Sequence, residues 1–228
     1  MRAFFLCLAL AAPAAALKAA PHSLRVCRSK TCTHGGSAHT LEGLRILASA
    51  SDEANDAIAG AATNTIAIAA MQTAFAASRV EKRGCLGSCG KGPNVLLARG
   101  DAVTTCYGIS KTNELVALLD DARLHVPEPA SKAWVRRTYA VRALRRNKPG
   151  EARALLTQAL HEAGALKSNA AALIAHLLDL RADVAESQGD GEAAEQDRAH
   201  SLKMRNLTHA TSPVVTSAEA KRLRPAGC

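Results

Sequence analysis

Aromatic residues are scarce in this chain. Its 228 residues include only three Phe, two Tyr and one Trp. A hydrophobic core must therefore be built mainly from Ala, Leu, Val and Ile, which favours close contacts between helices. With so few rings to stack against bases, the chain is not expected to bind nucleic acid. The net charge of +9 would instead attract an acidic protein or an anionic lipid.

Sequence motifs of common enzyme sites are also missing. The glycine-rich stretch 84–92 lacks the Gly-Lys-Ser/Thr ending of a phosphate-binding P-loop. No nucleophile-elbow sequence supports a Ser/His/Asp triad. No Cys-x-x-Cys motif opens a helix, as it would in a thiol–disulfide oxidoreductase. The sequence therefore argues against a stand-alone enzyme.

Acidic residues are absent before Glu42. Within residues 1–23, Arg2 precedes an apolar run at 4–10 and a small-residue stretch at 14–16, which is the pattern of a cleaved signal peptide. The run is too short and too rich in Ala for a membrane anchor, so no stable membrane span is expected after processing. The acid-poor continuation is typical of a transit peptide, which predicts a plastid reached through the secretory pathway. Secretion, or residence in an endomembrane lumen, is the alternative.

Cysteines, by contrast, are plentiful, and four of the seven form two close pairs. Cys27 and Cys32 enclose four residues, and Cys85 and Cys89 enclose three. Each pair can place two sulfur atoms on one short loop, and the glycines within 84–92 allow the second loop to curl closely around a buried group. Two such loops brought together supply four thiolates, the ligand set of a zinc ion or an iron–sulfur cluster.

Two other interpretations of the cysteines remain open at this level. A disulfide within each pair would suit a secreted interaction protein, and a zinc-binding module with four cysteine ligands tolerates these spacings. His34 and His39 flank the first pair, and we expect exposed positions at a helix start for both. Cys106 is expected to pack in the core, and Cys228 to be an incidental exposed thiol.

The residues around the cysteines predict a small α/β layer. The expected elements are a strand at 24–26, a helix capped by Ser37 and continuing through Leu47, a strand at 75–81, a hairpin of strands at 94–98 and 102–107, and a helix capped by Thr112 that extends to Leu119. Residues 48–70 are rich in Ala, Asn and Thr, and predict a helix extension or a loosely ordered insertion.

The remainder of the chain is expected to be helical. Two prolines in the segment 126–129 predict a linker. Apolar periodicity predicts a helical domain over 131–207, followed by a tail at 208–228. Turns are expected at 149–151 and 189–192. A faint repeat of Ala positions around these turns favours two degenerate tetratricopeptide-like hairpins, and an ordinary four-helix bundle is the alternative.

The cysteine motifs resemble those of a known family. The sequence runs Cys27-x4-Cys32-x3-Gly36-Ser37 and then Gly84-Cys85-Leu86-Gly87-Ser88-Cys89-Gly90-x-Gly92-Pro93-Asn94-Val95. This pattern is similar to the thioredoxin-like [2Fe-2S] ferredoxins and to the related small iron–sulfur subunit of respiratory NADH dehydrogenase. The resemblance covers residues 24–121. One departure is the separation of fifty-two residues between Cys32 and Cys85, which is longer than usual in the family.

The resemblance implies a fold, a cofactor and an activity. It predicts a thioredoxin-like domain over 24–126 that carries one [2Fe-2S] cluster and transfers single electrons or senses redox state. By matching position, the implied ligands are Cys27, Cys32, Cys85 and Cys89. Related ferredoxins often form dimers, so the resemblance also suggests a homodimer, although no feature of this sequence locates a self-contact surface.

A basic segment follows the predicted linker. No acidic residue interrupts the region 132–148, whose basic residues are Lys132, Arg136, Arg137, Arg142, Arg145, Arg146 and Lys148. Such a run usually forms the solvated face of a helix. The alternative is a docking face for an acidic redox partner, whose association would be accelerated by electrostatic attraction.

Overall fold

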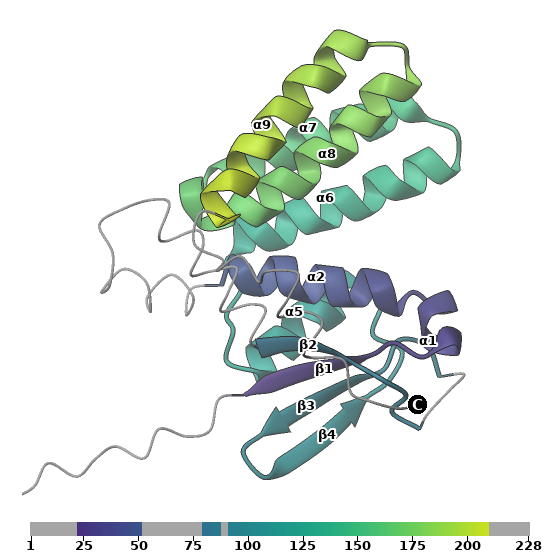
Figure 1. Cartoon of the computed structure of the whole chain (residues 1–228), viewed down its shortest axis with the longest axis vertical. Helices are drawn as coiled ribbons and strands as arrows, with labels where there is room; N and C mark the ends of the chain where they lie inside the picture. The colour runs from purple at the N-terminus through teal and green to yellow at the C-terminus, as the bar shows by residue number, and fades with distance from the viewer. Residues whose placement is uncertain (1–21, 52–78, 88–90, 210–228) are drawn as a thin grey trace, which may run out of the picture.

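The computed structural model describes residues 22–51, 79–87 and 91–209. The described chain forms an α/β part followed by a helical part (Figure 1). Most of the predicted targeting segment 1–23, the tail 208–228 and the insertion 48–70 lie outside the described residues, as do Cys89 and Cys228. Within the described ranges, no helix combines the length and the apolar character needed to cross a bilayer.

The α/β part is built on a four-stranded mixed sheet. Its strands are β1 (Ser23–Cys27), β2 (Val80–Arg83), β3 (Val95–Arg99) and β4 (Ala102–Cys106). Their order in the sheet is β2-β1-β3-β4, with β1 parallel to β2 and β3 antiparallel to both of its neighbours. The buried side chains of β1 and β3 include Leu24, Val26, Val95 and Leu97, which alternate along each strand as a half-buried sheet requires.

Two of the predicted strand regions agree with the structure and one is shifted. β1 and the β3–β4 hairpin lie where the sequence places them, and the hairpin turns at Gly100, whose φ of 59° suits a residue without a side chain. The strand expected at 75–81 is wrong at its start. β2 covers only Val80–Arg83, Arg79 is helical, and residues 75–78 lie outside the described part of the chain.

Three helices belong to the α/β part, namely α1 (Lys30–His34), α2 (Ser37–Ser49) and α5 (Thr112–Asp121). Both expected caps are displaced by one residue. Gly36 caps α2 at a φ of 96°, a conformation that glycine adopts easily, and Ser37 becomes the first helical residue. Lys111 caps α5, where the Glu114 carboxylate accepts hydrogen bonds from the Ser110 and Lys111 amides.

The helical part begins earlier than predicted. α6 (Glu128–Arg145) includes two residues of the expected 126–129 linker, because a proline fits the first turn of a helix, where its missing N–H is not needed. α7 (Pro149–Gly164) begins at a proline for the same reason, so residues 149–151 are helical rather than a turn. A 3₁₀ turn (Lys167–Ala170) leads into α8 (Ala171–Ser187), and α9 is Gly191–His209, which moves the second turn to 188–190.

The helices of this part pack in the order of the chain. α6 lies against α7, α7 against α8, and α8 against α9, whereas α6 and α9 are not among the closely packed pairs. Alanines allow these close approaches, and Ala140, Ala152, Ala159 and Ala163 are fully buried. Sequential packing of this kind is expected for stacked helical hairpins, because a closed four-helix bundle would also bring its first and last helices together.

One continuous core joins the two parts, with Trp134 of α6 at the junction. This side chain is fully buried, and it faces Gly43 of α2. A Cβ atom at Gly43 would lie 2.9 Å from Cζ2 of Trp134 and 3.0 Å from Cδ1 of Leu115, which is too close for either contact. The helices can therefore approach only because residue 43 has no side chain.

Polar side chains surround the indole. His39 and His176 both stack against the Trp134 ring, each with its centroid 5.7 Å from the indole centroid. Arg137 donates to His176 at 3.0 Å and lies near the Glu42 carboxylate at 3.4 Å. Burial lowers the pKa of His176 to about 4, an effect that Glu42 opposes and Arg137 reinforces.

This network corrects two sequence predictions. Arg137 belongs to the predicted solvated basic run, yet its side chain is only 9% exposed. His39 was expected to be exposed, yet it is half-buried against Trp134, while His34 is exposed as predicted. Both corrections arise because α2 and α6, which are far apart in sequence, pack together.

Candidate metal centre

The sheet delivers both cysteine loops to one edge. Because β1 and β2 are parallel neighbours, their carboxyl ends leave the sheet on the same side. Cys27, the last residue of β1, is in register with Arg83, the last residue of β2. The Arg28 amide donates to the Arg83 carbonyl at 2.8 Å, which fixes the start of the first loop against the end of β2. Cys85 follows two residues later.

The first loop is short and closes on itself. Ser29 caps α1 by accepting a hydrogen bond from the Cys32 amide at 3.4 Å. The Cys27 thiol lies 3.6 Å from the Ser29 hydroxyl. Cys27 and Cys32 are each about 1% exposed, so both sulfur atoms face the interior of the protein.

The second loop meets the first at the sulfur atoms. The backbone N–H of Leu86 donates to the Cys27 sulfur. Cys85 is close enough to Cys32 for a charge on one thiol to raise the pKa of the other. In its own loop, the Cys85 sulfur accepts from the Gly87 amide at 3.4 Å, and Cys85 is exposed. Both cysteine loops therefore lie at this edge of the sheet, with Cys85 near the first pair.

Hydrogen bonds stabilise negative charge on Cys27. Burial alone would raise the pKa of this thiol, but hydrogen bonds from Ser29, Leu86 and Cys32 outweigh burial and lower the pKa to about 7. The hydroxyl of Ser29 acts to lower the pKa of Cys32, but the neighbouring thiols and burial raise it overall. Cys27 is therefore the more acidic member of the pair.

A third segment completes the surroundings of the thiols. The Asn94 side-chain amide points at the Cys32 sulfur from 3.9 Å, and the Asn94 carbonyl accepts from the Cys27 amide at 2.9 Å. Here the chain crosses itself closely, since a Cβ at Gly92 would lie 3.2 Å from the Cα of Gly108. Gly92 has a φ of 83°, so this position favours glycine for both reasons.

The donor set fits a thiolate-held group. Cys27, Cys32, Cys85 and Cys106 are free cysteines in this structure. Among the described residues, however, no three His, Cys, Asp or Glu side chains are arranged closely enough to hold a metal ion. Cys89, the remaining member of the second pair, lies outside those residues. The N–H groups that donate to the Cys27 and Cys85 sulfurs are nevertheless the kind of surroundings that thiolate ligands need.

Cys106 is separate from this group. It is half-buried on β4 and contacts the hydrophobic core, as the sequence predicts. Burial raises the pKa of its thiol, and the nearby Asp121 carboxylate adds to this effect. Cys106 is therefore an inert core thiol and a useful internal control for the other three.

The basic run of 132–148 is not a single charged face. Lys132 pairs with Glu128 at 2.8 Å, Arg136 with Glu162 at 2.8 Å, and Lys148 with Glu151 at 3.4 Å. Arg137 is buried at the junction. Only Arg142, Arg145 and Arg146 are exposed with no ion pair to a described acidic residue.

Sequence reasoning did not single out Ser29, Leu86 or Asn94 as neighbours of the sulfur atoms. Only the Ser29 position carries a local signal, since a serine three residues before Cys32 can cap a short helix. Comparisons with protein-family models, curated proteins and solved structures find no match to this chain. The thiol site therefore has to be interpreted from its own chemistry.

Proposed function

We propose that this chain is a thioredoxin-like [2Fe-2S] protein that passes single electrons to a protein partner. Cys27, Cys32, Cys85 and Cys89 would hold the cluster. The observation that carries the proposal is the meeting of the two cysteine loops, where the Leu86 N–H donates to the Cys27 sulfur. Such a hydrogen bond stabilises negative charge on the Cys27 sulfur, which a thiolate ligand needs.

The fold assignment within this proposal is supported by the order of elements. A strand, a helix, a parallel strand, an antiparallel hairpin and a final helix follow one another along the chain. This is the order of elements that the sequence predicts for the small α/β layer, to which the family resemblance adds the thioredoxin-like assignment. The helical part, with its sequentially packed hairpins, supports the tetratricopeptide-like assignment over a closed bundle.

The cluster, the backbone amides and the burial of the cysteines would each contribute differently to electron transfer. A bound cluster supplies the one-electron chemistry. The amides of Leu86 and Gly87 donate to Cys27 and Cys85, and such N–H donors raise the reduction potential by stabilising charge on sulfur. Cys27 and Cys32 are buried, which excludes water from one side, whereas Cys85 is exposed. A partner would therefore approach from the side of Cys85, where the path for an electron is shortest.

Iron and sulfide analysis of the full chain, purified without oxygen, tests the proposal. We expect two irons and two acid-labile sulfides per chain, with visible absorption that bleaches on reduction. Changing any of Cys27, Cys32, Cys85 or Cys89 to Ser should remove most of the iron. Cys106→Ser is the matched control, because this thiol packs against the hydrophobic core on β4 and belongs to neither cysteine loop, and it should retain the full iron content.

Three results would count against the cluster. Stoichiometric zinc in a colourless protein would indicate a zinc-binding module with four cysteine ligands. Disulfides in the mature protein would favour a secreted interaction protein. Equal iron loss in Cys106→Ser and Cys32→Ser would mean that metal content follows general stability rather than ligation.

A further inference from the structure

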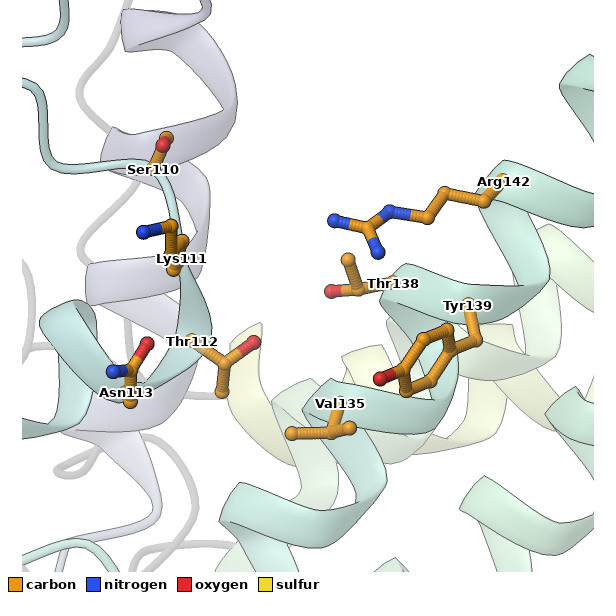
Figure 2. Close-up of a pocket in the computed structure, with 8 residues that line it drawn as sticks. All are labelled: Ser110, Lys111, Thr112, Asn113, Val135, Thr138, Tyr139 and Arg142. Carbon is orange, nitrogen blue, oxygen red and sulfur yellow. The ribbon is translucent and has the colours of Figure 1, made fainter.

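A cavity of about 270 Å³ opens between α5 and α6, away from the cysteine site (Figure 2). Its volume is close to the lower limit for small-molecule sites in proteins, which suits a small metabolite. Lys111 and Thr112 line it from the start of α5, and Val135, Thr138, Tyr139 and Arg142 line it from α6. Because α5 belongs to the α/β part and α6 to the helical part, the cavity lies at the junction of the two.

Arg142 provides an available positive charge. Figure 2 shows its guanidinium extending from α6 into the gap towards α5. The guanidinium lies over the Tyr139 ring, 5.6 Å from its centroid. In α6, Lys132 pairs with Glu128 and Arg136 with Glu162, but Arg142 has no ion pair with any acidic residue in the described ranges. A guanidinium without an acidic partner can bind an oxyanion through two parallel hydrogen bonds.

The nearby carboxylate limits the charge of the ligand. Glu114 accepts from the Ser110 and Lys111 amides at 2.9 Å and also pairs with the Lys111 ammonium at 3.5 Å. The amide end of α5 is therefore already satisfied, and the attraction for an anion comes from side chains. With Lys111 shared between Glu114 and the cavity, the net charge around the space is about +1, which suits a small ligand with one or two negative charges.

The remaining walls are suited to an organic molecule. In Figure 2 the hydroxyl groups of Thr112 and Tyr139 point into the gap, and Val135 forms an apolar wall below them. The Thr138 hydroxyl already donates to the Trp134 carbonyl at 3.0 Å, so towards a ligand it can act only as an acceptor. Hydroxyl donors, one apolar wall and one guanidinium together select a polar molecule with a carbon skeleton rather than a bare inorganic ion.

We propose that this cavity binds a small organic oxyanion, a carboxylate or a phosphate monoester, with Arg142 as its principal anchor. The segment that enters the cavity wall at Lys111 is hydrogen-bonded to residues that follow each of the two cysteine loops. Ile109, two residues before Lys111, donates its N–H to the Pro93 carbonyl at 3.0 Å and accepts at its carbonyl from the Thr40 hydroxyl at 2.7 Å. A bound anion would therefore hold the helical part against the segment that supports the site. The proposal goes beyond the proposed function and does not depend on a cluster.

Titration calorimetry of the purified full chain tests it with three probes. Glycerol 3-phosphate represents the phosphate monoesters, malate represents the carboxylates, and glycerol is the neutral control. We expect one of the two anions to bind and glycerol not to bind. Arg142→Gln should weaken binding by about tenfold or more, the usual effect of losing a hydrogen bond to a charged group. The anion that binds more tightly identifies the class of ligand.

The matched control is Arg145→Gln. Arg145 lies on the same helix and carries the same charge, but it does not line the cavity. General attraction to a basic surface would make the two variants equally weak, and this would overturn the proposal. The proposal would also be overturned if neither anion bound at concentrations well above the millimolar range. Thermal unfolding of both variants, with unchanged transitions, would show that Arg142→Gln acts on binding rather than on folding. Neither result bears on iron content, so failure here is distinguishable from failure of the cluster.

Discussion

The contact between Gly43 and Trp134 offers the sharpest test of how the two parts are joined. Gly43 lies inside α2, where replacing Gly by Ala in an open position would stabilise the helix by about 1 kcal/mol. Here the new Cβ would meet Trp134 at 2.9 Å and Leu115 at 3.0 Å. Trp134 is fully buried and cannot move aside. Overpacking of this kind costs about 1–3 kcal/mol, so the clash outweighs the helix gain.

We therefore expect Gly43→Ala to lower the free energy of unfolding by about 1 kcal/mol, with a range of roughly 0–2 kcal/mol. For a chain of this size, 1 kcal/mol corresponds to a decrease in Tm of about 2–4 °C. Urea unfolding can be followed by fluorescence, because Trp134 is the only tryptophan in the chain and reports directly on the junction. Gly150→Ala is the control, since an added Cβ in α7 meets nothing within 4 Å and should not destabilise the protein.

A double-mutant cycle with Trp134→Phe isolates the contact. Phenylalanine lacks the ring atoms that lie nearest to Gly43, so Gly43→Ala should cost less in that background, with a coupling of about 1 kcal/mol. Unfolding of these variants is followed by circular dichroism. The reasoning would be refuted if Gly43→Ala stabilised the protein as Gly150→Ala does, or if its cost were the same in both backgrounds.

Two further predictions concern charge. His176 has a pKa of about 4 in the folded protein, below the ordinary 6.5, so the unfolded chain binds its proton first as the pH falls. The contribution of His176 to stability is therefore complete above pH 6.5 and falls by up to about 3 kcal/mol towards pH 4. The unfolding free energy of His176→Gln should lack this part of the pH dependence. Identical pH profiles for the two proteins would show that the buried histidine is not responsible. For the proposed acidic redox partner, the double charge reversal of Arg145 and Arg146 to Glu should slow reduction by an acidic flavodoxin, used as a model donor, by about tenfold at low salt and little at high salt. Equal rates for the two proteins at low salt would remove the docking face from the proposal.

Local patterns in the sequence account for much of the fold. Alternation of apolar residues places β1 and the hairpin correctly, and the 3.6-residue period identifies the second part as helical, but not the break between α7 and α8. Errors fall at element ends, where one residue decides the boundary. Gly36 rather than Ser37 caps α2 because its left-handed conformation ends the preceding turn. Pro129 lies inside a helix rather than in a linker because a first turn tolerates proline.

The candidate sites likewise combine features that local sequence predicts with features that only tertiary contacts determine. The spacing of the cysteines marks which residues could bind a metal, but not that Leu86 and Asn94 donate hydrogen bonds to their sulfur atoms. The basic residues of 132–148 can be counted from the sequence. Lys132 pairs within its own helix, but the pairing of Arg136 with Glu162 and the burial of Arg137 beside Glu42 depend on acids in other helices.

The sequence by itself determined the types of elements, their order, and the two short loops that carry the cysteines, because these follow from interactions among residues a few positions apart. Only the tertiary structure decided that the two loops meet, since this depends on the parallel pairing of β1 with β2 across more than fifty residues. The tertiary structure also decided which charged side chains are buried, ion-paired or exposed, because the pKa of a side chain and its need for a partner depend on burial. Arg137 is the clearest case, since the helix that covers it begins at Ser37, far earlier in the chain.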